Sequence, residues 1–458
     1  MRPLPQSSPA PARAKPQRVL FVEVDVERSW AVASLGPAFI APFLRERGGH
    51  ETDYFRAKIE LTPAEVADEV ARRAPDVLGL SLTTRQWQRA RQLVAAIKAR
   101  LPELPVVAGG LHPTFSPEAV LAEPGFDFAC LGEGEEAMLE LVDALARQAP
   151  AAELHAIRNV WTEGGPRPTL RPPFEPLDEL PFMDRAFLDE LHGVVNVTTQ
   201  RGCPFPCTYC GARMFNELYQ ADGESYGRRR THQSVMDELR AIRDAQTLAY
   251  VIFLDDTFTI HHPWVKRFCE VYPEEIGVPF ALHARVETVN ERLLELLAKA
   301  GCAQITYGIE SGSERIRREV MRRPVTNDRF RDVFRWTKQA GIAVTANYML
   351  GLPEETPEDL RQTVELAREL DTLDFGYFVF YPYPGTALFK TCLERGYLPA
   401  DYEELPAVHR TSILNLPTLS QADIDAAYDE LTELRAERMA ALSGAGSAQH
   451  IRDSAAIG

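Results

Sequence analysis

Short runs of β-branched and other apolar residues alternate with helical segments along most of this chain, and this alternation restricts the possible folds more than any other feature. In the first third, such runs begin at Val19, Val77, Pro105 and Phe126. Parallel strands need a crossover helix between them, so this alternation predicts a parallel sheet that is covered on both faces. We therefore expect an α/β unit of Rossmann-like or flavodoxin-like type over residues 17–150.

The alternation resumes after a segment rich in Pro, Glu and Gly. Residues 151–190 have little periodicity and predict a linker, with a short hairpin near Val160 and Trp161. Beyond it, six strands alternate with helices, and these strands begin at Val194, Tyr250, Phe280, Gln304, Ala343 and Asp374. Six strands are too few to close an eight-stranded barrel, so residues 191–399 predict an open, partial (β/α)6 barrel with its chemistry at the C-terminal ends of the strands.

The two ends of the chain lack this rhythm. Residues 1–16 are rich in Pro, Ala and Ser and have no apolar core of a secretory signal, so they predict a disordered leader. Residues 400–458 predict a short helical region, with a helix from Ser420 to Leu442, and a disordered tail after Ser443. No segment approaches the roughly 18 uninterrupted apolar residues of a membrane span, and we expect a cytoplasmic protein.

The composition disfavours some classes of binding partner. The chain has 50 Lys and Arg against 66 Asp and Glu, which gives a net charge of −16. This acidic balance disfavours the broad basic surface that nucleic acid requires, so we expect a small-molecule substrate and no nucleic acid. Seven cysteines, an odd number, in a chain without a secretory signal also argue against a disulfide framework.

Three of the seven cysteines lie within eight residues, in the segment Cys203-Pro-Phe-Pro-Cys207-Thr-Tyr-Cys210. Pro204 and Pro206 exclude a helix here, so the three thiols can converge only on a loop. Structural zinc needs four ligands, and no fourth Cys or His lies close in the sequence. Three cysteines on a loop instead suit a [4Fe-4S] cluster with one iron left open to another ligand.

This loop resembles that of the radical S-adenosylmethionine (SAM) enzymes, whose third cysteine follows an aromatic residue, here Tyr209. The resemblance implies that Cys203, Cys207 and Cys210 hold the catalytic [4Fe-4S] cluster. It further implies that the open iron chelates SAM and that one electron, supplied by a flavodoxin or ferredoxin, cleaves SAM to a 5′-deoxyadenosyl radical. The alternatives are a zinc site or three unreactive thiols.

Several later segments also resemble the family's SAM-contacting motifs. They are Leu254-Asp-Asp-Thr-Phe, His283-Ala-Arg, Gly308-Ile-Glu-Ser-Gly, Met349-Leu-Gly-Leu-Pro-Glu and Tyr381-Pro-Tyr-Pro-Gly-Thr. With the cysteine loop, the resemblance assigns to SAM the residues Tyr209, Asp255, Arg285, Glu310, Ser311, Gly351 and Glu354. For each of them alone, a structural role in a turn or a helix cap is the alternative.

The N-terminal unit resembles the cobalamin-binding domain that precedes the radical SAM core in a large subfamily. The likeness lies in the segment from Pro37 to Glu51 and in the loop sequences GGLHPTF and LGEGE. Such sheets bind ligands at the C-terminal ends of their strands. There the resemblance assigns to cobalamin the residues Ser81, Thr83, Thr84, Gly109, Gly110, His112, Gly132 and Glu133. The D-x-H-x-x-G signature that supplies a histidine to cobalt is absent, so a scaffold domain without cobalamin is the alternative.

Together the two resemblances imply a cobalamin-dependent radical SAM methyltransferase that acts on an unactivated carbon of a small molecule or secondary metabolite. A cyclase, oxidase or rearrangement enzyme with the same cofactors is one alternative, and a radical SAM enzyme without cobalamin is another. A methylthiotransferase is disfavoured because the chain has no second three-cysteine site. A sensor is disfavoured because the chain has no basic output module.

Tyr377, Tyr381 and Tyr383 lie near the expected mouth of the barrel, where they could face a substrate. Core packing is their alternative role.

Overall fold

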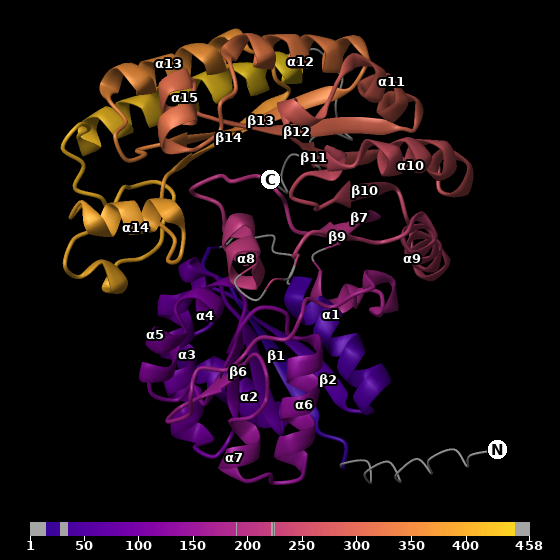
Figure 1. Ribbon diagram of the computed structural model, residues 1–458, viewed down its shortest axis with the longest axis vertical. Coiled ribbons are helices and arrows are strands. Elements are labelled where there is room, and N and C mark those ends of the chain that lie inside the picture. Colours follow the sequence, from indigo (N-terminus) through magenta and orange to yellow (C-terminus); the bar gives the residue numbers. More distant parts are fainter. Residues whose placement is uncertain (1–14, 28–34, 189, 221–222, 224, 445–458) are drawn as a thin grey trace. The chain divides into compact units, whose positions relative to one another are not determined.

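The computed structural model describes residues 15–27, 35–188, 190–220, 223 and 225–444 (Figure 1). The predicted disordered leader falls outside this range except for residues 15 and 16, and the predicted tail falls outside it except for residue 444. The chain forms two compact units: residues 36–82 and 89–171 with the first strand make the N-terminal unit, and residues 83–88 with 172–444 make the C-terminal unit.

A six-stranded sheet forms the centre of the N-terminal unit, in the order β2-β1-β3-β4-β5-β6. Its strands are β1 (Arg18–Val24), β2 (Glu51–Ala57), β3 (Val77–Ser81), β4 (Val106–Gly109), β5 (Phe128–Cys130) and β6 (Val160–Thr162). The first five pair in parallel, and their order is that of flavodoxin-like folds, which confirms the predicted class. β6 pairs antiparallel with β5, so this sheet is mixed.

Two strands of this sheet differ from the expectation. β2 was not predicted because its sequence, Glu-Thr-Asp-Tyr-Phe-Arg-Ala, has no apolar run; it lies at the edge of the sheet, where only partial burial is needed. β6 lies in the segment expected to be a linker, but it joins the sheet through backbone pairing with β5 instead of forming a hairpin of its own.

Helices connect these strands. They are α1 (Leu35–Phe43), which continues as a short π-helix to Gly48, α2 (Pro63–Arg73), α3 (Thr84–Arg100), α4 (Leu111–Phe115), α5 (Pro117–Ala122), α6 (Glu135–Ala146) and α7 (Ala151–Leu154). α2 shows why the chain turns helical where it does. The Glu65 N–H donates to Thr62 Oγ1, and the Thr62 N–H donates to Glu65 Oε2 at 2.8 Å, which makes a complete capping box.

The C-terminal unit contains a second six-stranded sheet, in which every strand is parallel and lies beside the one before it. Its strands are β7 (Val194–Val197), β10 (Tyr250–Phe253), β11 (Phe280–Ala284), β12 (Cys302–Glu310), β13 (Ala343–Leu350) and β14 (Asp374–Val379). This is the predicted open (β/α)6 barrel. Figure 1 shows the sheet as an arc with helices along its outer side.

The helices of this unit are α8 (Gly211–Gln220), α9 (His232–Ala245), α10 (His262–Glu275), α11 (Glu291–Lys299), α12 (Asn327–Gln339), α13 (Pro357–Glu369), α14 (Ala387–Glu394) and α15 (Gln421–Gly444). The predicted cap of α15 is confirmed, because the Asp423 N–H donates to Ser420 Oγ at 3.2 Å. A small antiparallel pair, β8 (Gln200–Arg201) with β9 (Arg228–Arg229), flanks the cysteine loop. Among the described residues, no helix is long and apolar enough to cross a membrane.

Alternation along the central strands separates an apolar face from a polar one. On β12 and β13, Ile305, Tyr307 and Tyr348 are fully buried in the main core. The positions between them are only half-buried, and they hold polar side chains such as Thr306 and Thr345, whose hydroxyl oxygens lie 2.7 Å apart. The two-residue period of a strand therefore places its polar side chains on the face opposite to the main core.

Candidate active site

A buried carboxylate, that of Asp255, holds the segment that leads into the cysteine loop. Asp255 follows β10 and is 2% exposed. Its Oδ1 accepts hydrogen bonds from the N–H groups of Thr199 at 2.7 Å and Gln200 at 3.0 Å, and its Oδ2 accepts one from Thr199 Oγ1 at 2.7 Å. Burial raises the pKa of Asp255 to about 6 although these bonds lower it. Both oxygens are therefore used to hold the segment that leads into the loop, and the assignment of Asp255 to SAM remains a prediction.

The three cysteines of the loop lie close together at the C-terminal end of the barrel strands. Cys203 and Cys207 are buried and Cys210 is half-buried, and all are free thiols. Burial raises the pKa of Cys210 to about 12, and the nearby sulfurs of Cys207 and Cys203 add to this rise. The Asn216 side-chain amide of α8 donates to the carbonyl of Cys203 at 2.6 Å, which fixes the loop from its far side.

The arrangement of the thiols suits a cluster better than a single ion. Among the described residues, no group of three or more His, Cys, Asp or Glu side chains is placed to hold one metal ion. A [4Fe-4S] cluster makes no such demand, because each cysteine binds a different iron. Three cysteines on one loop, two of them buried and one half-buried, therefore fit such a cluster and would leave one of its irons open.

A row of alternating charges contacts the cysteine loop, and we call it the charged row: Arg285, Glu287, Arg323 and Glu310. Arg285 follows β11 and donates to Cys207 Sγ from Nη1 at 3.0 Å and to Glu287 Oε1 from Nη2 at 2.5 Å. Arg323 is 1% exposed and lies 3.5 Å from Glu287 Oε2 and 4.0 Å from Glu310 Oε1. Such close pairing lets several charges remain in a largely buried site.

Two of the predicted SAM residues meet at one end of the charged row. Tyr209, the aromatic residue of the motif, lies near Glu310, and the two groups interact electrostatically. Burial raises the pKa of Glu310, while the charges of Arg323 and Arg285 and the hydroxyl of Tyr209 lower it. Glu310 has a φ of +70°, a left-handed value that is uncommon for a residue with a side chain, at the point where the pairing of β12 with β13 shifts register. The structure thus brings Tyr209, Arg285 and Glu310 together around the cysteine loop.

The other predicted SAM residues make different contacts. Ser311 is fully buried, and its hydroxyl lies 3.4 Å from that of Thr363 in α13. Glu354 accepts hydrogen bonds on Oε1 from Arg395 Nη1 at 2.9 Å and from the Tyr397 hydroxyl at 2.6 Å. These side chains are used within the protein, so their assignment to SAM stays a prediction, as does that of Gly351, which has a φ of +77°.

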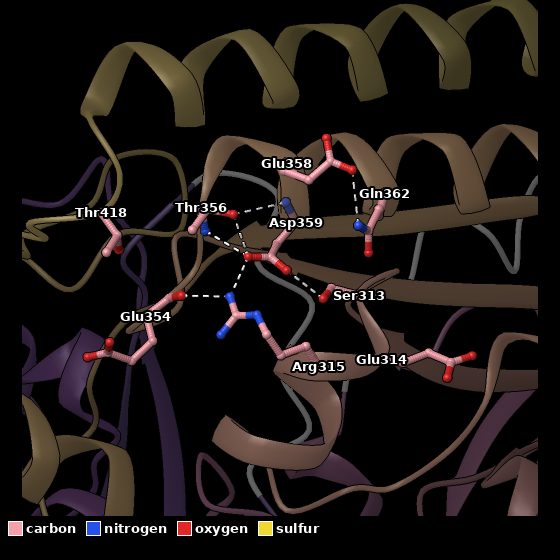
Figure 2. Close-up of a pocket in the computed structure, with 9 residues that line it drawn as sticks. All are labelled: Ser313, Glu314, Arg315, Glu354, Thr356, Glu358, Asp359, Gln362 and Thr418. Carbon is pink, nitrogen blue, oxygen red and sulfur yellow. Dashed lines mark hydrogen bonds and ion pairs between the residues drawn. The ribbon is translucent and has the colours of Figure 1, made fainter.

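A shallow pocket lies beside Glu354 (Figure 2). Figure 2 shows Arg315 between the carbonyl of Glu354, which accepts a hydrogen bond at 2.9 Å, and Asp359, at 2.5 Å. Asp359 also accepts from Ser313 Oγ at 2.6 Å and from the Thr356 hydroxyl as part of the cap of α13. Hydrogen bonds among the polar groups around this pocket join the segments that follow β12 and β13.

The three tyrosines near the expected mouth of the barrel make different contacts. Tyr377 donates to Thr432 Oγ1 of α15 at 2.9 Å, so it packs on the outer side of β14. Tyr383 lies within hydrogen-bond distance of His409 Nε2, at 2.9 Å, and its ring lies 5.2 Å from that of Tyr381. Core packing therefore accounts for Tyr377.

Glu355 is a buried carboxyl group that the sequence did not single out. It is fully buried, and its Oε2 accepts hydrogen bonds from the N–H groups of Gly351 at 2.7 Å and Leu352 at 3.0 Å. Its Oε1 has no hydrogen-bond partner among the described residues. Burial raises the pKa of Glu355 to about 8 although the two backbone bonds lower it. The group therefore favours its neutral form in the folded protein.

We expect the Glu355→Gln variant to unfold at a higher temperature than the wild type at pH 8, with a smaller difference at pH 5. The folded pKa of about 8 lies above the ordinary value of 4.5, so the folded state binds the extra proton and stability falls as pH rises through this window. Gln keeps an oxygen for the two N–H donors and removes the charge, which predicts a gain of about 4 kcal/mol at pH 8. Thermal unfolding from pH 5 to 8 measures it. Glu358→Gln is the control because Glu358 lies exposed nearby, and equal pH slopes for wild type and E355Q would refute the assignment.

The predicted cobalamin residues gather at the C-terminal ends of the N-terminal sheet. β3 ends at Ser81 and β4 at Gly109. Gly110 has a φ of +94°, and a Cβ there would lie 2.8 Å from the backbone nitrogen of Leu82, so only glycine fits. Thr114 Oγ1 donates to the carbonyl of Gly110 at 2.7 Å and accepts from the N–H of Gly132 at 3.0 Å, which ties two loops together. Small residues therefore line this edge at the ends of β3 and β4.

The remaining cobalamin candidates lie in the same loops. Thr83 precedes α3, which begins at Thr84, and its N–H and hydroxyl both donate to Gln86 Oε1, at 2.8 and 2.9 Å. His112 is 6% exposed, and burial lowers its pKa to about 4, so its imidazole is neutral at pH 7. Glu133 is half-buried. The small-residue edge and a neutral imidazole fit a cobalamin-binding loop set, and the individual contacts stay predictions.

Comparison with family models agrees with this division of the chain. Residues 31–142 match the model of the B12 binding domain, and residues 197–367 match that of the radical SAM superfamily. The first match covers the small-residue edge of the N-terminal sheet. The second covers the cysteine loop and the charged row.

Individual proteins are similar over most of the chain. An uncharacterized methyltransferase of Pyrococcus horikoshii is 31% identical over 389 residues, which cover 80% of this chain and 79% of that protein. The anaerobic magnesium-protoporphyrin IX monomethyl ester cyclase of Rubrivivax gelatinosus is 26% identical, with 81% and 69% covered. The structure of the radical SAM methyltransferase TsrM from Kitasatospora setae, with cobalamin and a [4Fe-4S] cluster bound, shares the fold with a TM-score of 0.69 at 16% identity, covering 92% of this chain and 89% of that one.

Proposed function

The chain belongs to the radical SAM enzymes that carry a B12-binding domain, and on this premise we propose that it is a cobalamin-dependent methyltransferase that acts on an unactivated carbon of a small molecule. The observation that carries the proposal is the loop of three closely spaced cysteines, Cys203, Cys207 and Cys210, at the C-terminal end of a half-barrel in a chain that also has a cobalamin-type sheet. The similarity to the cyclase supports a second candidate reaction, in which the same cofactors oxidise or cyclise the substrate.

The cofactors supply the hard chemistry and the protein supplies position and electrostatics. When bound, the [4Fe-4S] cluster supplies a low-potential electron and an open iron for SAM, and cobalamin supplies a carrier for the methyl group. The protein itself holds the cysteine loop through hydrogen bonds of Asp255 and Asn216. It also places the guanidinium of Arg285, a charged hydrogen-bond donor, against the sulfur of Cys207. Tyr209 and Glu310 would lie beside the bound SAM, and we propose them as its contacts together with the other predicted residues.

For cobalamin, we propose that the loops after β3, β4 and β5 hold the ligand. Ser81, Gly109, Gly110 and Gly132 would let the backbone approach it closely. His112, neutral at pH 7, is the one candidate of this set with a nitrogen that can ligate a metal. Thr83, Thr84 and Glu133 complete the proposed set.

The electron donor and the compartment follow from the chemistry. A cluster of this kind needs a one-electron reductant, and we propose a flavodoxin or ferredoxin as partner. All seven cysteines are free thiols, which agrees with a reducing compartment, and we propose the cytoplasm.

The two products of SAM distinguish the candidate reactions. Methyl donation leaves S-adenosylhomocysteine, whereas radical cleavage leaves methionine and 5′-deoxyadenosine. We expect the reconstituted holoenzyme, given reductant and SAM, to form both, with S-adenosylhomocysteine at least equal to bound cobalamin. Chromatography of the quenched reaction measures them. 5′-Deoxyadenosine without S-adenosylhomocysteine would instead support the cyclase-type reaction, and absence of both would refute the proposal.

A further inference from the structure

The cysteine loop is contacted at alternate residues by the charged row. The Arg285 guanidinium lies over the ring of Phe205, with 3.9 Å from its central carbon to the ring centroid. The same guanidinium donates to Cys207 Sγ at 3.0 Å. At the other end of the row, Tyr209 lies near Glu310. Residues 205, 207 and 209 point to one side of the loop and are held there by side chains from the ends of β11 and β12.

Arg285 is itself held in place from several sides. Its side chain is 12% exposed, and Nη2 donates to Glu287 Oε1. Glu287 in turn faces the fully buried Arg323, which faces Glu310. A guanidinium is planar and permanently charged, so stacking on Phe205 and a bond to Glu287 fix both its plane and its rotation. The direction of its N–H toward the sulfur is therefore set before any cofactor binds.

We propose that Arg285 is a positioning residue for the iron–sulfur cluster: its guanidinium donates a hydrogen bond to the ligand sulfur of Cys207 and thereby raises the reduction potential of the cluster. This inference rests on the proposed function, because it presumes that Cys207 binds iron. Hydrogen bonds to cluster sulfurs, net charge and solvent exposure set the potential of such centres. A cationic donor favours the reduced state, which carries one more negative charge.

This role differs from a direct contact between Arg285 and SAM, such as a bond to its carboxylate, to which the family resemblance assigned this residue. The two roles make separate predictions for the protein without SAM. A hydrogen bond to a ligand sulfur acts on the cluster whether or not SAM is present. A bond to the SAM carboxylate acts only when SAM is bound.

The test is a redox titration of the reconstituted full-length protein without SAM, poised with titanium(III) citrate and followed by the electron paramagnetic resonance signal of the reduced cluster. In Arg285→Gln we expect the ratio of reduced to oxidised cluster at a fixed potential to fall about tenfold, which for a one-electron couple corresponds to about 59 mV. Iron per chain, measured on the same samples, should stay near that of the wild type.

Arg213→Gln is the matched control. Arg213 of α8 also bonds to the cysteine loop, but its Nη1 donates to the carbonyl of Pro206 at 2.9 Å and not to a sulfur. We expect its ratio to stay within about twofold of the wild type. If R285Q keeps the wild-type ratio without SAM, or if R213Q lowers it as much as R285Q does, the proposal is overturned.

A further variant keeps the test decisive if R285Q does not retain its cluster. Arg285→Lys keeps the charge but loses the planar fork that reaches sulfur and carboxylate together. It should lower the ratio about threefold, and a wild-type ratio in R285K would overturn the proposal. A wild-type protein that holds its cluster but forms no S-adenosylhomocysteine would refute the methyltransferase proposal and leave this comparison intact.

Discussion

The Cys207→Ala variant should lose SAM cleavage by on the order of a thousandfold or more, because a cluster with two protein ligands cannot be held in the geometry that SAM requires. Cys207 is 4% exposed, lies between two other thiols of the same loop and receives the hydrogen bond of Arg285. The measurement is 5′-deoxyadenosine formed per chain under reductant, with iron content determined on the same protein.

Cys302→Ala is the control for this variant. Cys302 is 5% exposed, so the two thiols are matched in burial, but it lies at the start of β12, outside the loop. We expect C302A to keep its iron and its SAM cleavage. Cleavage at the wild-type rate in C207A would show that the loop is not the cluster site.

Asp255→Ala should lower the free energy of unfolding by about 3–5 kcal/mol. The variant leaves three donors without their acceptor: the N–H groups of Thr199 and Gln200 and the hydroxyl of Thr199. Each buried, unpaired donor costs about 1–3 kcal/mol. Since this segment leads directly into the cysteine loop, D255A should also retain less iron after reconstitution. Chemical denaturation followed by circular dichroism, with iron analysis, measures both effects.

Asp255→Asn separates the hydrogen bonds from the charge. The Asn oxygen can still accept from the two N–H groups, and the Thr199 hydroxyl can rotate to accept from the new amide. We therefore expect a loss of about 1 kcal/mol and near-normal iron in D255N. An equal loss in D255A and D255N would contradict the role given to the hydrogen bonds.

Much of the fold could be predicted because local sequence patterns specify its strands and helices. The strands of the half-barrel are short apolar runs, and helix starts such as those before Pro63 and Gln421 have capping residues of their own. β2 could not be predicted from an apolar run because an edge strand needs only part of its surface buried. The bounds of α10 were not predicted, and Pro263 and Pro273 interrupt its pattern, although the first stands at its start and the second in its last turn, near its C-terminal end.

The site was predictable only where it is contiguous in sequence. Three cysteines in eight residues form a motif by themselves, but the charged row joins Arg285, Glu287, Glu310 and Arg323 from separate segments, and its pairing exists only in the folded chain. The adjacent pair Asp255 and Asp256 shows the same limit. The two carboxylates are adjacent in the sequence, and only the structure shows that Asp255 is the buried one.

The most direct test of the account is the iron, sulfide and cobalt content of the protein after anaerobic reconstitution with iron, sulfide and cobalamin and removal of unbound cofactor. The account predicts about four iron, four sulfide and one cobalt per chain. In C207A the iron should fall and the cobalt should remain, because no residue of the cysteine loop belongs to the proposed cobalamin set. Iron without cobalt would contradict the cobalamin-dependent reaction, and absence of both would contradict the account at its base.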